Sequence, residues 1–498
     1  MYAQTLHCPT LDTTPTAPQE GRITMSQPAS HDPTEGLLSL ADEGRPRAAA
    51  ALTHGQTRMA YLLASEATGR IIFCREYGWL TWTGTHWSPD HGVGARRELL
   101  AILRSSLRDP LPDTVRAAKS CMSNASQQGV LGIAADLPEF RVMLEDLDSD
   151  PYLVNLPNGT FDLRTNELSP HDPNDRITKI TRASFNPDAP SPVWSEHLQY
   201  FQPDVQIREF LQRFFGYTLL GKVTEHIFLI CYGPKGANGK GTTDRAIQYA
   251  LGDYATAVDP NLLVATRANS PDAPSPARFA LKGRRYVSMS ETERRAPIAE
   301  ALMKNLTGGD PIFARALKKD PVVFEPSHTL VLYTNHKPKL SADDGGVWRR
   351  VKLVPFDISR PPAQRDTTID AQLQLEADAI LTWMLEGYAQ FLQIGLAPPP
   401  QVEAATSSYQ YEEDGFSQFF DESFTAHPTE YLYARDIWDD WEAFVRQNQV
   451  TSMTQKELYR RLEAKGFDRA RRSDGAIFKG ITRRDVDPAT DNLLDEEG

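Results

Sequence analysis

The sequence predicts an α/β fold built around a phosphate-binding loop, with an α+β unit before it and a winged helix after it. The first observation is an apolar, strand-like run that ends at Tyr232 and leads into the glycine-rich segment GPKGANGKGTT. The second is a series of further strand-like runs with helical patterns between several of them, at 284–290, 322–324, 329–334 and 351–356. This alternation is typical of an α/β nucleotide-binding domain. The third is a basic helix-and-hairpin pattern near the end of the chain.

Composition and pattern divide the chain of 498 residues into five segments. We expect a disordered segment over 1–55, an N-terminal α+β domain over 56–195, a central α/β domain with a helical lid over 196–405, a small domain over 415–484 and an acidic disordered tail over 485–498.

Charge, cysteine usage and hydropathy exclude several classes of protein. The formal net charge of −13 argues against nonspecific coating of nucleic acid by the whole surface, although a local basic channel stays compatible with it. The four cysteines are scattered and form no CxxC pair, so neither a zinc ribbon nor a disulfide framework is expected. No apolar run approaches 18 residues and no signal-peptide pattern is visible, so we expect no membrane association and a cytoplasmic location.

The N-terminal domain is expected to begin with short strands. The segment GWLTWTGTHW predicts two strands around Thr83-Gly84, and its tryptophans fit the core of a small sheet better than a surface that stacks bases. Residues 95–145 look helical, and the turn-rich stretch 155–179 predicts β-structure. Further on, residues 204–220 and 366–394 carry apolar side chains at helical spacing, and the triple proline at 398–400 is expected to end the second of these units.

The phosphate loop carries most of the chemistry. Glycines let backbone N–H groups turn toward phosphate oxygens, Lys240 would reach the β- and γ-phosphates, and the next helix presents its N-terminus to them. The loop holds one residue more than the usual pattern, and Gly241 replaces the usual hydroxyl, so Thr242 is the nearest hydroxyl to Mg²⁺. A chance glycine-rich turn is the alternative. The predicted nucleotide-binding residues are Gly233, Gly236, Ala237, Asn238, Gly239, Lys240, Gly241, Thr242 and Thr243.

Polar residues at the ends of later strands complete the predicted site. Glu291 follows a strand-like run and would hold Mg²⁺ and polarise the attacking water, with Glu293 as a second candidate; a surface glutamate is the alternative. Asn335 ends the run TLVLYT and would orient the water, unless it only caps the strand. Arg350 or Arg349, just before the strand at 351–356, could stabilise transition-state charge in a neighbouring subunit; a surface ion pair is the alternative.

The C-terminal segment 456–484 is basic in an acidic chain. It carries ten basic and four acidic residues. Thr454 and Glu457 predict a capping box that opens a helix, and a hairpin is predicted to turn at Ser473-Asp474-Gly475. This pattern predicts a winged helix that binds duplex DNA, with a protein-binding winged helix as the alternative. The predicted DNA contacts are Arg460, Arg461, Arg471, Arg472 and Lys479.

The ordered motifs GANGKGT, SETE, LMKNLTGGDPIFAR, TNHKP and GGVWRRVKLVPF resemble one family closely. The chain is similar, over about 60–480, to superfamily-3 helicases of the phage/plasmid primase–helicase group, which are related to poxvirus and satellite-phage replication proteins. The resemblance includes that group's helicase-associated N-terminal domain. It implies an AAA+-like ATPase domain, ATP and Mg²⁺ as ligands, a homo-oligomeric ring of six subunits, and contact with host replication proteins in a bacterial cytoplasm.

The resemblance also implies roles for individual residues. Lys240 would be the phosphate-loop lysine, Glu291 the Walker B acid, Asn335 the first sensor and Arg350 the arginine finger. Lys318 and Lys319 would lie on a hairpin that grips single-stranded DNA in the ring channel, which suits two adjacent cations at a turn. Only about fifty low-complexity residues precede the associated domain, so we expect no primase activity in this chain.

Three functions are compatible with these residues. The first is an ATP-dependent DNA helicase of phage- or plasmid-type replication. The second is a DNA-dependent ATPase that loads or remodels DNA without processive unwinding. The third, supported only by the unusual loop, is a non-enzymatic origin-binding protein with a degenerate nucleotide site.

Overall fold

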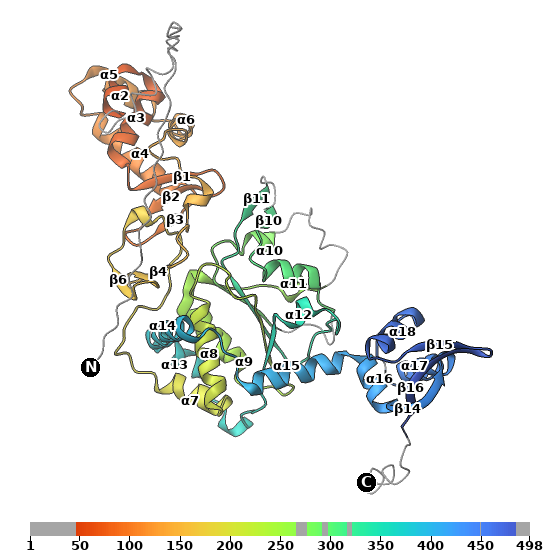
Figure 1. Cartoon of the computed structure of the whole chain (residues 1–498). Coiled ribbons are helices and arrows are strands. Elements are labelled where there is room, and N and C mark those ends of the chain that lie inside the picture. Colours follow the sequence, from red (N-terminus) through yellow and green to blue (C-terminus); the bar gives the residue numbers. More distant parts are fainter. Residues whose placement is uncertain (1–45, 265–275, 291–296, 316–320, 449, 485–498) are drawn as a thin grey trace, which may run out of the picture.

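The computed structural model describes residues 46–264, 276–290, 297–315, 321–448 and 450–484. Three parts follow one another in Figure 1: an N-terminal part, a central α/β domain and a small C-terminal part that is joined to the centre by a long helix. In the described residues, no helix is long and apolar enough to cross a membrane.

The N-terminal part combines a helical cluster with a small antiparallel sheet. Its helices are α2 (Pro46–Leu52), α3 (Gly55–Ala67), α4 (Val93–Ser106), α5 (Pro112–Ser120) and α6 (Asn124–Ala135). The sheet has the order β1 (Ile71–Cys74), β2 (Gly78–Trp82) and β3 (Trp87–Pro89). Trp79 and Trp87 are buried in it, which confirms the core interpretation of the tryptophan segment.

A second antiparallel sheet connects this part to the centre. It consists of β4 (Leu153–Leu156), β5 (Gly159–Asp162) and β6 (Glu167–Ser169), and Pro157 and Asn158 form the first turn. Val154, Leu156 and Phe161 are buried in the same hydrophobic cluster as the helices of the central domain. This sheet therefore shares its core with the α/β domain rather than with the helices before it.

The central domain is organised by a parallel sheet. Its strands are β7 (Phe228–Tyr232), β8 (Ala255–Ala257), β9 (Tyr286–Ser290), β12 (Thr329–Thr334) and β13 (Val351–Pro355). The order across the sheet is β13-β7-β12-β9-β8, and every neighbouring pair is parallel. The α/β prediction is confirmed. Because β7 lies between strands that come later in the chain, its carboxyl end is a switch point, where ligands bind in open α/β sheets.

Helices cover both faces of this sheet, since its strands are apolar on both sides. One face packs on α7 (Pro192–Phe201), α8 (Val205–Tyr217), α9 (Lys240–Leu251), α13 (Ile369–Leu375) and α14 (Ala377–Ile394). The other packs on α11 (Glu300–Leu306), α12 (Gly345–Trp348) and α15 (Pro400–Glu413). Shorter elements are α10 (Pro276–Phe279) and the 3₁₀ turns at 144–146, 173–175, 252–254, 260–262 and 362–364.

Helix α15 differs from the prediction that the triple proline at 398–400 ends the central unit. Proline is tolerated at the first position of a helix, and Pro400 begins α15 in this way. The helix packs along the edge strand β13, where the hydroxyl of Thr406 accepts a hydrogen bond from the N–H of Leu353 (3.0 Å). It continues to Glu413, beyond the expected boundary at 405, and leads into the C-terminal part (Figure 1).

The C-terminal part alternates helices and strands in a compact unit. Its elements in chain order are α16 (Gly415–Ser423), β14 (Phe424–Tyr433), α17 (Ala434–Asn448), α18 (Gln455–Ala464), β15 (Arg469–Arg472) and β16 (Gly475–Arg483). The strands form an antiparallel sheet in the order β14-β16-β15. The predicted turn is present, because Arg472 pairs with Gly475 across it. Of the predicted capping box, the structure shows the bond in which the Thr454 hydroxyl accepts from the N–H of Glu457 (3.3 Å), whereas the Glu457 carboxylate pairs with Arg460.

Candidate functional site: a phosphate loop at the sheet's switch point

The loop between β7 and α9 has a backbone that glycine makes possible. Gly239 has a φ of +80°, in the left-handed region, and a Cβ there would lie 2.4 Å from the Phe201 ring. At Gly233, an added Cβ would lie 2.3 Å from the carbonyl oxygen of Phe356. Gly236 has open space where its Cβ would be. The loop is therefore tightly packed at its two ends and open at its middle, which fits a phosphate cradle.

Asn238 holds the loop together from inside. Its buried amide nitrogen donates to the carbonyl oxygens of Lys235 (2.6 Å), Phe356 (3.2 Å) and Gly233 (3.3 Å). These bonds join the loop to itself and to the end of β13. In the structure, the Asn238 side chain stabilises the loop conformation. Its contact with a nucleotide remains a prediction.

Lys240 lies at the centre of the site. It is the first residue of α9 and only 6 % exposed. Its ammonium group donates to the Gly233 carbonyl (2.9 Å) and to the Asn335 side-chain oxygen (3.0 Å). Strands β7 and β12 are parallel neighbours, so the loop after one and the asparagine after the other meet at the same edge. Two residues that are far apart in sequence are thus brought together as the sequence predicted.

The two threonines of α9 have different surroundings. Thr243 is buried, and its hydroxyl is hydrogen-bonded to Nε2 of His197 on α7 (2.9 Å). Burial, and then the charge of Arg360, lower the pKa of His197 to about 4, so this histidine is neutral at neutral pH. Thr242 is partly exposed, with an Arg245 nitrogen 3.4 Å from its hydroxyl. Of the two hydroxyls, Thr242 is therefore the one that remains accessible to a metal ion.

The predicted acidic residues follow strand β9 in the sequence. Strand β9 ends at Ser290, next to β12, as a strand that carries a Walker B acid would. Glu291 and Glu293 themselves lie outside the described residues. Within the ranges that the structure describes, no three His, Cys, Asp or Glu side chains gather as a metal-binding group.

A buried polar network behind the loop was missed by the sequence analysis. The carboxylate of Asp244 on α9 accepts hydrogen bonds from the hydroxyls of Tyr286 (2.8 Å) and Ser288 (3.2 Å) on β9. The Tyr333 hydroxyl on β12 lies 2.9 Å from that of Tyr286. Burial raises the pKa of Asp244. The network links α9 to β9 and β12, two strands whose carboxyl ends face the site. In the sequence, only the alternation of Tyr and Ser with apolar residues in β9 indicates it.

The two candidate finger arginines lie at the opposite edge of the sheet. The Arg350 carbonyl accepts from the N–H of Phe228 at the start of β7, so both arginines are remote from the loop of their own chain. Arg350 is 6 % exposed, and its guanidinium donates to the Gly346 carbonyl (2.6 Å). Burial, and then the charge of Arg349, lower the pKa of Arg350. Arg349 is exposed. The finger role of either residue stays a prediction.

A protein β-hairpin lies where the resemblance predicts one that binds DNA. Its two antiparallel strands are β10 (Ile312–Arg315) and β11 (Pro321–Phe324). Lys318 and Lys319 fall between them, outside the described residues. Val322 on β11 packs against a buried cluster of the N-terminal part that includes Ile72 and Leu144. The arms of the hairpin are thus supported by the domain that precedes the phosphate loop.

Most of the predicted basic contacts in the C-terminal part are exposed. The exposed residues are Arg460, Arg471, Arg472 and Lys479. Arg460 forms an ion pair with Glu457, and the Arg472 guanidinium carbon lies 4.4 Å from the centre of the Tyr431 ring. These side chains are available to a phosphate backbone, although contact with DNA remains a prediction.

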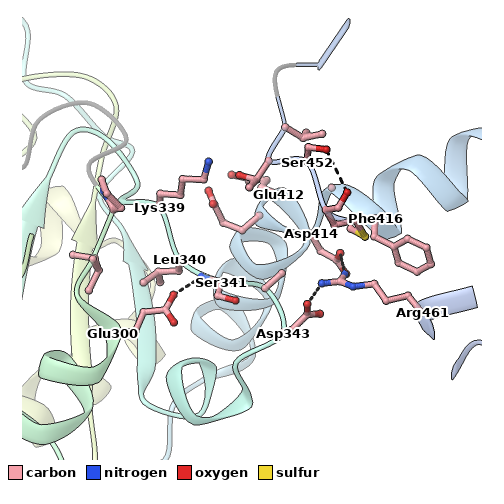
Figure 2. A pocket seen from close by; sticks show the side chains of 18 residues that line it. Glu300, Lys339, Leu340, Ser341, Asp343, Glu412, Asp414, Phe416, Ser452 and Arg461 are labelled. Carbon is pink, nitrogen blue, oxygen red and sulfur yellow. Dashed lines mark hydrogen bonds and ion pairs between the residues drawn. The ribbon is translucent and has the colours of Figure 1, made fainter. Parts of the chain in front are cut away.

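Arg461 differs from the other predicted basic contacts, because its side chain is mostly buried and engaged in ion pairs. Its side chain is 15 % exposed and lies in an ion-pair cluster with Asp414 (3.0 Å), Glu457 (3.5 Å) and Asp343 of the central domain. Figure 2 shows its guanidinium directed toward Asp343 and Asp414, in the pocket between the two parts. Contact between Arg461 and DNA stays a prediction, and the structure shows its guanidinium joining the C-terminal part to the central domain.

Comparison with known proteins agrees with the predicted resemblance. Residues 60–203 match the family described as D5 N terminal like. The chain is 30 % identical over 325 residues to "Putative helicase L207/L206" of Acanthamoeba polyphaga mimivirus, a match that covers 61 % of this chain and 34 % of the relative. It is 24 % identical over 339 residues to "Putative primase C962R" of African swine fever virus (strain Badajoz 1971 Vero-adapted), covering 63 % and 35 %.

Two further matches extend the comparison. The chain is 28 % identical over 260 residues to "Putative helicase 022R" of Frog virus 3, covering 48 % of this chain and 26 % of that protein. The apo structure of the NrS-1 C-terminal region aligns with 60 % of this chain and 76 % of its own, at 10 % identity and a TM-score of 0.37. The chain thus spans about a third of the length of the first curated relatives it matches.

Proposed function

Because this chain belongs to the primase–helicase family of superfamily-3 type, we propose that it is an ATP-dependent DNA helicase of DNA replication. The observation that carries the proposal is the bond between Lys240 and Asn335. It puts an ammonium group and a side-chain amide at the carboxyl ends of neighbouring parallel strands, where hydrolysis of a nucleoside triphosphate would need a cation for the phosphates and a group that orients the water.

The proposed chemistry assigns one task to each group. Lys240 would neutralise charge on the β- and γ-phosphates, and the Thr242 hydroxyl would face Mg²⁺ together with Glu291. The metal would supply charge neutralisation between the β- and γ-phosphates. Glu291, or Glu293, would polarise the attacking water, and Asn335 would orient it.

We also propose that the nucleotide site is completed by a second subunit in a hexameric ring. The support is the position of Arg349 and Arg350 at the edge of the sheet opposite to the loop of their own chain. An arginine there can act only on another subunit's nucleotide. Arg350 was favoured by family resemblance, but Arg349 is the exposed member of the pair, and a finger has to be accessible.

Subunit mixing tests this arrangement. We expect Arg349→Ala to lower ATP hydrolysis at least about a hundredfold, because arginine fingers contribute about 10³–10⁵ in rate. Lys240→Ala is expected to be inactive as well, yet a mixture of the two variants should regain hydrolysis, since some interfaces then combine an intact loop with an intact arginine. Arg350→Ala is the matched comparison. Rescue of Arg350→Ala alone would assign the finger to Arg350, and no rescue of either would contradict a shared site.

DNA would be contacted at two places. We propose that Lys318 and Lys319, which lie between β10 and β11 in the sequence, bind the phosphate backbone of single-stranded DNA in the ring channel. We propose, on the basis of the order α16, β14, α17, α18, β15, β16, that the C-terminal part acts as a winged helix, in which α18 would enter a major groove of duplex DNA. Arg460, Arg471, Arg472 and Lys479 would contact its backbone.

Strand displacement distinguishes a helicase from an ATPase that only remodels DNA. We expect wild-type protein to separate a forked duplex and to hydrolyse ATP faster when single-stranded DNA is present. Lys318→Ala/Lys319→Ala should abolish strand separation and DNA stimulation while basal hydrolysis stays within about twofold, because these lysines contact DNA and not the nucleotide. Normal hydrolysis without any strand separation by wild-type protein would favour the loader instead.

A further inference from the structure

The direction of a bound nucleotide can be inferred from Lys240. The lysine of a phosphate loop reaches the β- and γ-phosphates, and here its ammonium lies against Asn335 at the end of β12. The terminal phosphates therefore belong on the β12 side of the loop. Strand β13 borders β7 on the other side, so the nucleoside end of the ligand is directed toward the residues that follow β13.

A stacked aromatic and arginine group lies at that position. The Arg360 guanidinium carbon is 4.3 Å from the centre of the Tyr200 ring and 5.4 Å from that of Phe201. The two rings are 4.9 Å apart, edge to face, at the end of α7. The Phe201 ring also packs against Gly239, so the group directly adjoins the phosphate loop.

Backbone and side-chain bonds hold this group in place. The N–H of Arg360 donates to the carbonyl of Ala237 in the loop (2.8 Å). At the other end of the group, the Gln202 amide donates to the carbonyl of Pro355 at the end of β13 (2.9 Å). The loop, the segment after β13 and the end of α7 are thus joined as one unit. The only ion pair found for Arg360 among the described residues is the 3.9 Å contact with Glu196, whose side chain is 78 % exposed.

We propose that Tyr200 and Arg360 form the surface that receives the nucleobase and ribose of the triphosphate. Aromatic rings and guanidinium planes both stack on bases, and here the two are layered on each other beside the cradle. The inference rests on the proposed nucleotide site and adds to it the residues that hold the nucleoside. Neither belongs to the loop, strand-end or arginine motifs that define the site in the sequence.

The test compares a ligand that has a nucleoside with one that does not. Calorimetric titration with ADP and with inorganic tripolyphosphate should show that Tyr200→Ala weakens ADP binding about tenfold and leaves tripolyphosphate binding within twofold. Arg360→Ala should act in the same way, and Tyr200→Phe, which keeps the ring, should bind ADP like wild type. Tyr152→Ala is the matched control, because the Arg164 guanidinium carbon lies 5.2 Å from the centre of the Tyr152 ring in a similar pair beside the β4–β6 sheet.

The outcomes separate this inference from the proposed function. Unchanged ADP binding in Tyr200→Ala, or an equal loss of ADP and tripolyphosphate in Arg360→Ala, would overturn the inference while the nucleotide site stands. If wild-type protein bound neither ligand, the proposed function would fail first, and the inference with it.

Discussion

Replacing Lys240 with alanine is expected to lower ATP hydrolysis at least about a hundredfold. The ammonium group lies between the phosphate loop and the end of β12 and is hydrogen-bonded to both. Removing one fixed charge from a site where transition-state charge develops costs about 10²–10³ in rate. Hydrolysis is measured by release of inorganic phosphate at saturating ATP, with and without single-stranded DNA.

Lys235→Ala is the matched control for Lys240→Ala. Lys235 lies in the same loop and carries the same charge, but its side chain is exposed. We expect Lys235→Ala to change the rate of hydrolysis by at most a few-fold. The comparison of the two variants then shows whether the rate depends on where the positive charge lies or only on the number of charges in the loop. A similar loss in both variants would contradict the assigned role of Lys240. Retention of hydrolysis in Lys240→Ala would argue that the unusual loop is not the catalytic nucleotide site.

The sequence predicted the sheet well because its strands are apolar on both faces. The runs 329–334 and 351–356 correspond to β12 and β13, and the helix over 204–220 corresponds to α8. Strand β8 was not predicted, since Ala255–Ala257 is too short to show a pattern. Helix α15 was not predicted, because a triple proline usually ends a helical unit, whereas Pro400 occupies the first helical position, which tolerates proline.

Residues of the candidate site that lie at the ends of strands could be predicted from the sequence. Residues whose contacts depend on the direction of the side chain could not. Lys240 and Asn335 meet because parallel strands bring their carboxyl ends to one edge. Arg460 and Arg461 cannot be distinguished by counting charge, yet neighbouring residues on a helix face different directions, and only Arg461 is turned toward Asp343 and Asp414. The contact between Tyr200 and Arg360 joins segments about 160 residues apart that share no motif.

The crossing of α8 and α14 predicts the largest effect on stability. Two glycines lie where these helices touch. A Cβ on Gly387 would lie 2.0 Å from the carbonyl oxygen of Gln212, and one on Gly216 would lie 2.2 Å from the backbone nitrogen of Tyr388. These neighbours are backbone atoms that cannot rotate away, so the helices have to separate to accept a methyl group. We expect Gly387→Ala to lower the free energy of unfolding by about 3 kcal/mol, although alanine favours a helix by about 1 kcal/mol.

Gly132→Ala is the control that separates the helix crossing from helix propensity. Gly132 lies inside α6, and no atom lies within 4 Å of its added Cβ, so the same substitution should be neutral or stabilise by up to about 1 kcal/mol. Urea unfolding followed by circular dichroism should give a lower midpoint for Gly387→Ala and an equal or higher midpoint for Gly132→Ala. Because α14 also packs on α9, the helix that carries Lys240, loosening of the crossing should weaken nucleotide binding before the protein unfolds. Equal midpoints in the two variants would mean that the helices can move apart without cost, and that close backbone contact does not hold this face of the sheet together.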